Sequence, residues 1–264
     1  MTTTTRNFEA EAQVLKLYNF WMNDPLLARF YDHSDFCNYG YAAVETKVQR
    51  DASAALVHKL LDFIPEKNGT ILDVACGLGA TTRELLQFYK PEDITGINIA
   101  DDQLARAAAN VPGARFLNMD AAHLEFEDNS FDNVICVEAA FHFQTREAFM
   151  REALRVLKPG GRLVIADILG WQTKPTRANK IKNPTAYSSL LASCGYENRQ
   201  VIDTTKECIR AYSKRITAWP GEERRAGRLG FGPFARMWLG AHGYALFMRF
   251  GHSHYVLASG QKPV

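Results

Sequence analysis

The sequence predicts an α/β protein built on a parallel sheet. Between Thr70 and Leu169, five short apolar runs rich in β-branched residues alternate with three helical patterns. Units of strand, helix and strand cross over right-handed, so their strands lie parallel in one sheet. The length of 264 residues suits one large domain, or one domain with an added cap.

The expected elements of this central region follow one another in regular order. Strands are predicted over 70–77, 93–100, 114–121, 131–138 and 161–169. Helices are predicted over 81–89, 101–111 and 146–157. Each strand therefore leads into a loop at its carboxyl end, the edge of such a sheet where ligands bind.

The flanking regions are less regular. Before the sheet, we expect an amphipathic helix over 8–22 that ends near Asp24, then an aromatic-rich segment and a helix over 45–63. After the fifth strand, the expected elements are a basic loop over 171–185, a helix over 185–196, strands over 198–205 and 252–260, and a mostly helical stretch over 206–240 that is interrupted at 220–233.

Composition excludes several classes of protein. The formal net charge of +2 gives no argument for nucleic acid, and the five scattered cysteines form no CxxC pair. No metal site is therefore expected. The N-terminus shows no apolar secretory segment, and no run approaches the roughly 18 apolar residues of a membrane span. We expect a cytoplasmic protein without a membrane span.

The stretch ILDVACGLGATT, residues 71–82, joins the first strand to a helix through a glycine turn. Gly77 and Gly79 allow a sharp turn and a close approach to a ligand. The dinucleotide fingerprint would need a third glycine at Thr82, and no phosphate-loop lysine is present. Taken alone, the turn is also compatible with an ordinary tight connection.

Four stretches in the same order resemble the motifs of class I S-adenosylmethionine-dependent methyltransferases. They are ILDVACGLG, GINIADDQL, NMDAAHLEF and LRVLKPGGRLVIAD, and the resemblance covers about residues 70–169. It implies a Rossmann-like, doubly wound sheet of seven strands in the order 3-2-1-4-5-7-6. A helical lid would come from residues 1–55, and the domain, 56–264, would carry a lid or acceptor insert at about 206–240.

The resemblance implies S-adenosylmethionine as cofactor and S-adenosylhomocysteine as product. Asp73 and the glycine turn would hold the amino-acid end, Asn98 the ribose, and Asp120 the adenine; the less favoured alternative for Asp120 is a helix cap. Ala75 stands where the first glycine of the motif often lies, and Asn98 where an acid is common. The implied cofactor-binding residues are Tyr39, Tyr41, Asp73, Ala75, Gly77, Gly79, Asn98, Ile99, Gln103, Asp120, Ala121 and Glu138.

The apolar stretch 134–146, VICVEAAFHFQTR, contains a glutamate and a histidine at the end of the fourth strand. Because the family's fourth and fifth strands are neighbours, Glu138, His142 and Asp167 are expected at one crevice. His142 suits a general base for a hydroxyl acceptor, and Asp167 an orienting carboxylate. Some sugar and natural-product O-methyltransferases resemble this arrangement. The alternative is that His142 and Glu138 only line the pocket and that Asp167 caps a turn.

The function that these expectations favour is O-methylation of a small, partly apolar secondary metabolite, with His142 as base. C- or N-methylation of a small molecule, and a non-methyl reaction such as cyclisation, remain alternatives. Nucleic-acid methylation is disfavoured, because EAAFH does not match the N/D-P-P-Y type motif of such enzymes. The expected partner is a small-molecule acceptor. Oligomeric state stays open, with a homodimer as one alternative.

Overall fold

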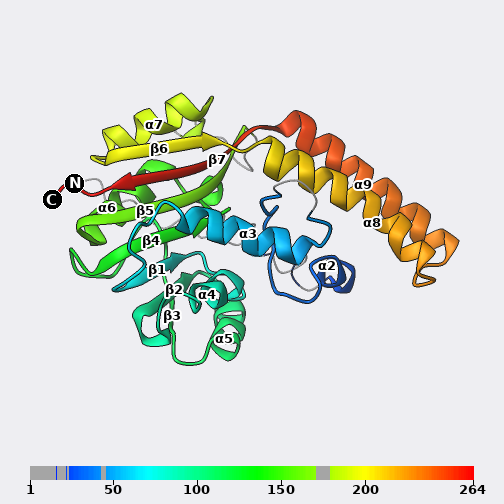
Figure 1. The fold of residues 1–264 in the computed structure, drawn as a ribbon, viewed down its shortest axis with the longest axis horizontal. Coiled ribbons are helices and arrows are strands. Elements are labelled where there is room, and N and C mark those ends of the chain that lie inside the picture. Colours follow the sequence, from blue (N-terminus) through cyan, green and yellow to red (C-terminus); the bar gives the residue numbers. More distant parts are fainter. Residues whose placement is uncertain (1–15, 17–21, 23, 43–45, 171–178) are drawn as a thin grey trace.

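The computed structural model of the chain describes residues 16, 22, 24–42, 46–170 and 179–264. Seven strands form one mixed sheet in the order β3-β2-β1-β4-β5-β7-β6, which confirms the predicted order (Figure 1). All neighbours pair parallel except β7, which is antiparallel to β5 and β6. The strands are β1 (Ile71–Val74), β2 (Ile94–Asn98), β3 (Arg115–Asn118), β4 (Phe131–Val137), β5 (Leu157–Gly170), β6 (Glu197–Asp203) and β7 (His252–Gln261).

Two apolar cores lie on the two faces of the sheet, because successive side chains of a strand point to opposite faces. In β5, Val164 joins one core and Ile165 the other. The first core packs against α3 (Gln49–Leu61) and α4 (Ala80–Leu85), through side chains such as Leu60. The second packs against α6 (Arg146–Val156) and α7 (Pro184–Ser193). The sheet is therefore covered on both sides, as a doubly wound fold requires.

The register aligns the carboxyl ends of the central strands. Val74, the last residue of β1, pairs with Ile97 of β2 and Cys136 of β4. Cys136 in turn pairs with Ile165, two residues before Asp167. The loops after β1, β2, β4 and β5 consequently open at one edge. The helix after β2 is α5 (Asp101–Asn110), and a short 3-10 turn, η1 (Pro91–Asp93), precedes that strand.

The N-terminal segment contains a helix that the sequence did not predict. Most of the helix expected over 8–22 lies outside the described residues, but Lys16 and Met22 are helical and Asp24 is not, in agreement with the expected end near Asp24. The additional helix, α2 (Pro25–Phe30), begins directly after Asp24. The Asp24 carboxylate accepts hydrogen bonds from the amides of Leu26 and Leu27, and Pro25 occupies the first turn, where its missing N–H costs nothing. The segment then runs to α3, which is shorter than the predicted 45–63.

Between β6 and β7, a two-helix arm projects from the sheet (Figure 1). A π-helical turn, η4 (Lys206–Arg210), leads into the first helix of the arm, α8 (Ala211–Arg225), and the chain returns through the second, α9 (Phe231–Gly251). The expected interruption over 220–233 is shorter than predicted, because α8 continues past Pro220 to Arg225. The helical segment also runs beyond the expected end at residue 240. We call α8 and α9 the arm.

Candidate functional site

Three residues of the turn between β1 and α4 have left-handed backbone conformations. Ala75 has φ 59°, Gly77 54° and Gly79 80°. Glycine adopts such angles without strain, whereas alanine does so at a cost of about 1–2 kcal/mol. A Cβ on Gly79 would lie 3.0 Å from the Cα of Ala107 in α5, so the two elements approach closely there. The conformation of Ala75 explains why a glycine is common at this position of the motif.

Asp73, in β1, carries a buried carboxylate with one unsatisfied oxygen. Its side chain is inaccessible to solvent. Oδ2 accepts a hydrogen bond from the Thr82 hydroxyl at 2.7 Å, whereas Oδ1 has no hydrogen-bond partner among the described residues. Burial raises the pKa of Asp73 to about 7, and the bond from Thr82 offsets this only partly. A buried acceptor of this kind fits the ammonium of an amino-acid group.

Asn98 and Gln103, two predicted ribose contacts, are brought together at the end of β2. Asn98 Nδ2 donates to Gln103 Oε1 at 2.8 Å, and Asn98 Oδ1 accepts from the backbone amide of Ile99 at 3.0 Å. Both side chains are buried. The amide pair is thus pre-positioned, and its contact with ribose hydroxyls stays a prediction.

Asp120 follows β3 and stabilises a turn, and no helix begins there that it could cap. Its Oδ1 accepts a hydrogen bond from the Ala122 amide at 2.9 Å, and its carbonyl accepts from the amide of His123. Ala121 beside it is buried. One carboxylate oxygen therefore stabilises the turn, and the contact with adenine stays a prediction.

Glu138 directly follows β4 and has a left-handed conformation with φ 51°, as Ala75 does directly after β1. Its Oε1 accepts hydrogen bonds from the Tyr39 backbone amide at 2.7 Å and from the Tyr255 hydroxyl at 2.6 Å. Burial raises the pKa of this carboxyl to about 7, against the lowering effect of the two bonds, and Asp167 adds a smaller increase. Strained residues that carry polar groups are characteristic of functional sites.

Tyr39 and Tyr41, both among the implied cofactor-binding residues, lie in different settings. The Tyr39 hydroxyl is 2.8 Å from that of Tyr244 in α9 and 3.0 Å from His252 Nε2, so its side chain is fixed against the arm. Tyr41 is half-buried and packs against the core, while its amide donates to the carbonyl of Ala52 in α3. Cofactor contact by either residue remains a prediction.

His142 lies in a single 3-10 turn, η2 (Ala140–His142), between β4 and α6. Its ring packs against Phe141, with ring centroids 4.1 Å apart. Removal from water, together with the smaller effect of the nearby charge of Arg146, lowers the pKa of His142 to about 4. The imidazole is therefore neutral at pH 7, the protonation state that a general base requires.

Asp167 forms a buried ion pair with Arg146 that the sequence did not predict. Arg146 Nε lies 2.6 Å from Asp167 Oδ2, and Nη2 lies 3.3 Å from Oδ1. The guanidinium also donates to the carbonyls of Ile168 and Asn179, and both charged side chains are almost fully buried. Both carboxylate oxygens of Asp167 thus bind the guanidinium of Arg146, and the role of Asp167 in orienting His142 stays a prediction.

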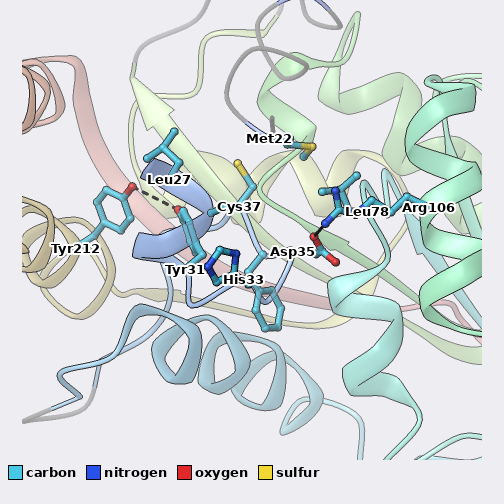
Figure 2. Close-up of a pocket in the computed structure, with 11 residues that line it drawn as sticks. Met22, Leu27, Tyr31, His33, Asp35, Cys37, Leu78, Arg106 and Tyr212 are labelled. Carbon is cyan, nitrogen blue, oxygen red and sulfur yellow. Dashed lines mark hydrogen bonds and ion pairs between the residues drawn. The ribbon is translucent and has the colours of Figure 1, made fainter. Parts of the chain in front are cut away.

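A cavity of about 190 Å³ lies between the N-terminal segment and the glycine turn (Figure 2). Leu78 of the turn and Arg106 of α5 line one side, and Tyr31 lines the other. Arg106 is paired with Asp35 of the N-terminal segment. The Tyr31 hydroxyl donates to that of Tyr212 in α8 at 3.3 Å. The N-terminal segment therefore adjoins both the cofactor motif and the arm, as a lid would.

Comparison with known proteins agrees with this geometry. Residues 72–165 match the family described as a methyltransferase domain. The chain is 32% identical over 215 residues to 27-O-demethylrifamycin SV methyltransferase of Amycolatopsis mediterranei, covering 72% of this chain and 76% of that one. The chain belongs to the class I S-adenosylmethionine-dependent methyltransferases.

Two further comparisons define the range of relatives. The chain is 36% identical over 183 residues to 2-methyl-6-phytyl-1,4-hydroquinone methyltransferase of Synechocystis sp., covering 66% of this chain but only 56% of that one. The match thus spans little more than half the length of that relative. The solved structure of the cyclase SpnF superposes with a TM-score of 0.72 at 22% identity, covering 96% of this chain and 97% of that one. It shows the shared fold.

Within the described ranges, no helix has the length and apolar character needed to cross a membrane. The same ranges contain no group of three or more His, Cys, Asp or Glu side chains suited to hold a metal ion.

Proposed function

We propose that this chain transfers a methyl group from S-adenosylmethionine to a hydroxyl oxygen of a small, partly apolar secondary metabolite. The observation that supports methyl transfer most directly is the buried oxygen of Asp73, which has no hydrogen-bond partner among the described residues and lies beside a turn with three left-handed residues. A cationic amino group would form a hydrogen-bonded ion pair with that carboxylate and offset the free energy that its burial costs. Oxygen as the acceptor is supported by the rifamycin relative, whose name specifies an O-demethylated substrate.

The bound cofactor supplies an electrophilic methyl group, whose carbon–sulfur bond breaks as the acceptor oxygen attacks, and S-adenosylhomocysteine leaves. For such an in-line displacement, the protein's main task is to position the two reactants. Glu138 serves this task, because its bonds to Tyr39 and Tyr255 fasten the N-terminal segment over the carboxyl edge of the sheet.

His142 is proposed as the general base that receives the hydroxyl proton. An acceptor oxygen becomes far more acidic as it forms the new bond to carbon, so a weak base can take the proton at that stage. The low pKa of His142, about 4, keeps the imidazole unprotonated and ready at neutral pH. Arg146, whose charge lowers the pKa of His142, is itself neutralised by the buried ion pair with Asp167.

The lining of the cavity supports a partly apolar acceptor. Leu27, Phe36 and Tyr212 line it together with Asp35 and Arg106, so apolar and aromatic surface lies beside a few polar groups. Pockets of this composition bind apolar or aromatic molecules and orient them through their polar groups.

The test has two stages. Calorimetry should show binding of S-adenosylmethionine, and absence of binding would contradict the proposal. Incubation with small aromatic and polyketide alcohols and methyl-labelled cofactor should then give labelled ether and an equal amount of S-adenosylhomocysteine. Product formed without S-adenosylhomocysteine would indicate cyclisation or another non-methyl reaction. Label on carbon or nitrogen would indicate the corresponding alternative.

A further inference from the structure

Helix α9 exposes an apolar stripe on its outer side. Leu239, Leu246 and Phe250 are 65%, 57% and 79% exposed, and their spacing of seven and four residues places them on one helix face. Its buried residues, Ala241 and Met248, lie on the opposite side of the helix. The helix is therefore apolar on both its inner and its outer side.

This outer face is open along its length. A Cβ added to Gly232, Gly240 or Gly243 would meet no atom within 4 Å. Phe231, 71% exposed, and Trp238 continue the apolar surface toward the tip of the arm. Large apolar side chains that are exposed together on one helix indicate a binding face. The arm aromatics Phe231 and Trp238 thus face outward, instead of lining a pocket.

The charges around the stripe have one sign. Helix α9 contains two arginines and no Asp or Glu. At 100° per residue, Arg236 and Arg249 flank the stripe on its two sides, and both are exposed. Over residues 211–251 there are seven Lys or Arg and only two Glu, although the whole chain has a net charge of only +2. The excess of positive charge is therefore concentrated on the arm.

Two of the cations lie over exposed phenylalanine rings. The guanidinium of Arg249 is 6.0 Å from the ring centroid of Phe250, and that of Arg224 is 5.3 Å from that of Phe231. Cationic groups beside exposed aromatic rings place positive charge at the level where lipid phosphates lie, with the rings below it.

We propose that the outer face of α9 docks in the plane of a bilayer that contains anionic phospholipid. Leu239, Leu246 and Phe250 enter the boundary between headgroups and acyl chains, and Arg236 and Arg249 bind the phosphates on either side. This is the behaviour of an interfacial helix, and it needs no helix that crosses the membrane.

Charge complementarity favours a bilayer over a second copy of the chain. In a two-fold dimer built on α9, each face would meet itself, so arginines would oppose arginines with no carboxylate on either α9 to compensate. An anionic surface neutralises both arginines and covers the apolar stripe in one contact. The docking face also leads to the site, because α9 carries Tyr244 and continues into His252, the two partners of Tyr39.

The proposal is tested by flotation of the intact protein with vesicles of phosphatidylcholine alone and of an equal mixture of phosphatidylcholine and phosphatidylglycerol. The protein should float with the mixed vesicles, bind the neutral ones more weakly, and be released by salt. This assay uses neither cofactor nor methyl acceptor, so its result is independent of the proposed function.

Two variants separate the apolar and the charged contributions. Changing Leu239, Leu246 and Phe250 together to Gln should weaken binding by about 100-fold or more. The pair Arg236→Gln and Arg249→Gln should weaken binding to mixed vesicles by roughly tenfold and leave binding to neutral ones unchanged. Ile202→Thr, at an exposed apolar residue of β6, is the matched control, and circular dichroism of each variant verifies the fold.

Several results would overturn the proposal. One is a wild-type protein that stays off the mixed vesicles, and another is a triple variant that binds as well as wild type. A wild-type dimer that ignores vesicles and is split by the triple variant in sedimentation would assign the face to a second copy. If the protein binds vesicles only after residues 1–15 are removed, the occupant of the outer face of α9 is that segment and not a bilayer.

Discussion

The Tyr39 backbone amide donates a 2.7 Å hydrogen bond to Glu138, 99 residues further along the chain. This bond joins the N-terminal segment directly to the end of β4. The carboxylate accepts a second bond from Tyr255 in β7, so one buried acid connects the N-terminal segment, the central sheet and the strand that follows the arm. Glu138, a polar residue within an apolar stretch of the sequence, thus connects three parts of the molecule.

Replacing Glu138 by Gln should change how stability depends on pH. Burial raises the pKa of Glu138 from 4.5 to about 7, so its contribution is complete below about pH 4.5 and is lost as pH rises through 7. Gln does not titrate. Between pH 5 and 8, the free energy of unfolding of the variant should therefore rise relative to that of wild type, by up to about 3 kcal/mol. Urea denaturation at several pH values measures this. A pH-independent difference, or an equal effect of Glu66→Gln on the surface, would contradict the prediction.

Asp73→Asn should separate cofactor binding from folding. A neutral amide costs less to bury than a carboxylate, so at pH 8 the variant without cofactor should be as stable as wild type or more stable. Its affinity for S-adenosylmethionine should fall about 10- to 100-fold, because the charged partner of the ammonium is lost. Calorimetry and thermal unfolding test the two halves. The exposed Asp62→Asn should change neither, and undiminished affinity in Asp73→Asn would remove Asp73 from the cofactor site.

His142→Ala should lower kcat by about 10²- to 10⁴-fold if the acceptor is a hydroxyl, with unchanged affinity for the cofactor. Because the pKa of His142 is lowered to about 4, the acid limb of the wild-type kcat/KM profile attributable to this residue should lie near pH 4 and not near 6.5. Steady-state rates between pH 4 and 9 measure it. The exposed His123→Ala is the control. Full turnover by His142→Ala would indicate that no base is needed, as for an amine acceptor.

The buried pair of Arg146 and Asp167 should matter far more to stability than a surface pair on the same helix. Arg146→Ala should cost about 3–5 kcal/mol in the free energy of unfolding, since it leaves Asp167 buried without its counter-ion. Arg151→Ala removes an exposed pair with Glu147 and should cost about 0.5 kcal/mol or less. Denaturant titration compares the two. Similar losses would mean that the inner pair is screened by water.

The fold could be predicted because its signals are local. Alternating apolar runs and helical patterns predict the strands, and the glycine turn and the residues that follow each strand predict the carboxyl edge. The partner of Asp167 could not be predicted. Arg146 opens α6 as an ordinary helix residue, and its burial depends on Asn179, 33 residues away, and on the end of β5.

The arm shows the same limit of prediction. Apolar residues in α9 suggest a core helix or a pocket lining, since sequence periodicity cannot show which side finds a partner. Only the observed packing distinguishes the covered side of Met248 from the open side of Leu239. Likewise, the alanine in the glycine turn was noted from the motif, but its strained backbone and that of Glu138 become evident only in the structure.

Helix α9 ends at Gly251 and β7 begins at His252, with no loop between them. The arm therefore passes directly into the strand beside Tyr39, whose hydroxyl contacts both Tyr244 of α9 and His252, the first residue of β7. A surface bound to the outer face is therefore connected, through α9 and His252, to the N-terminal segment at Tyr39.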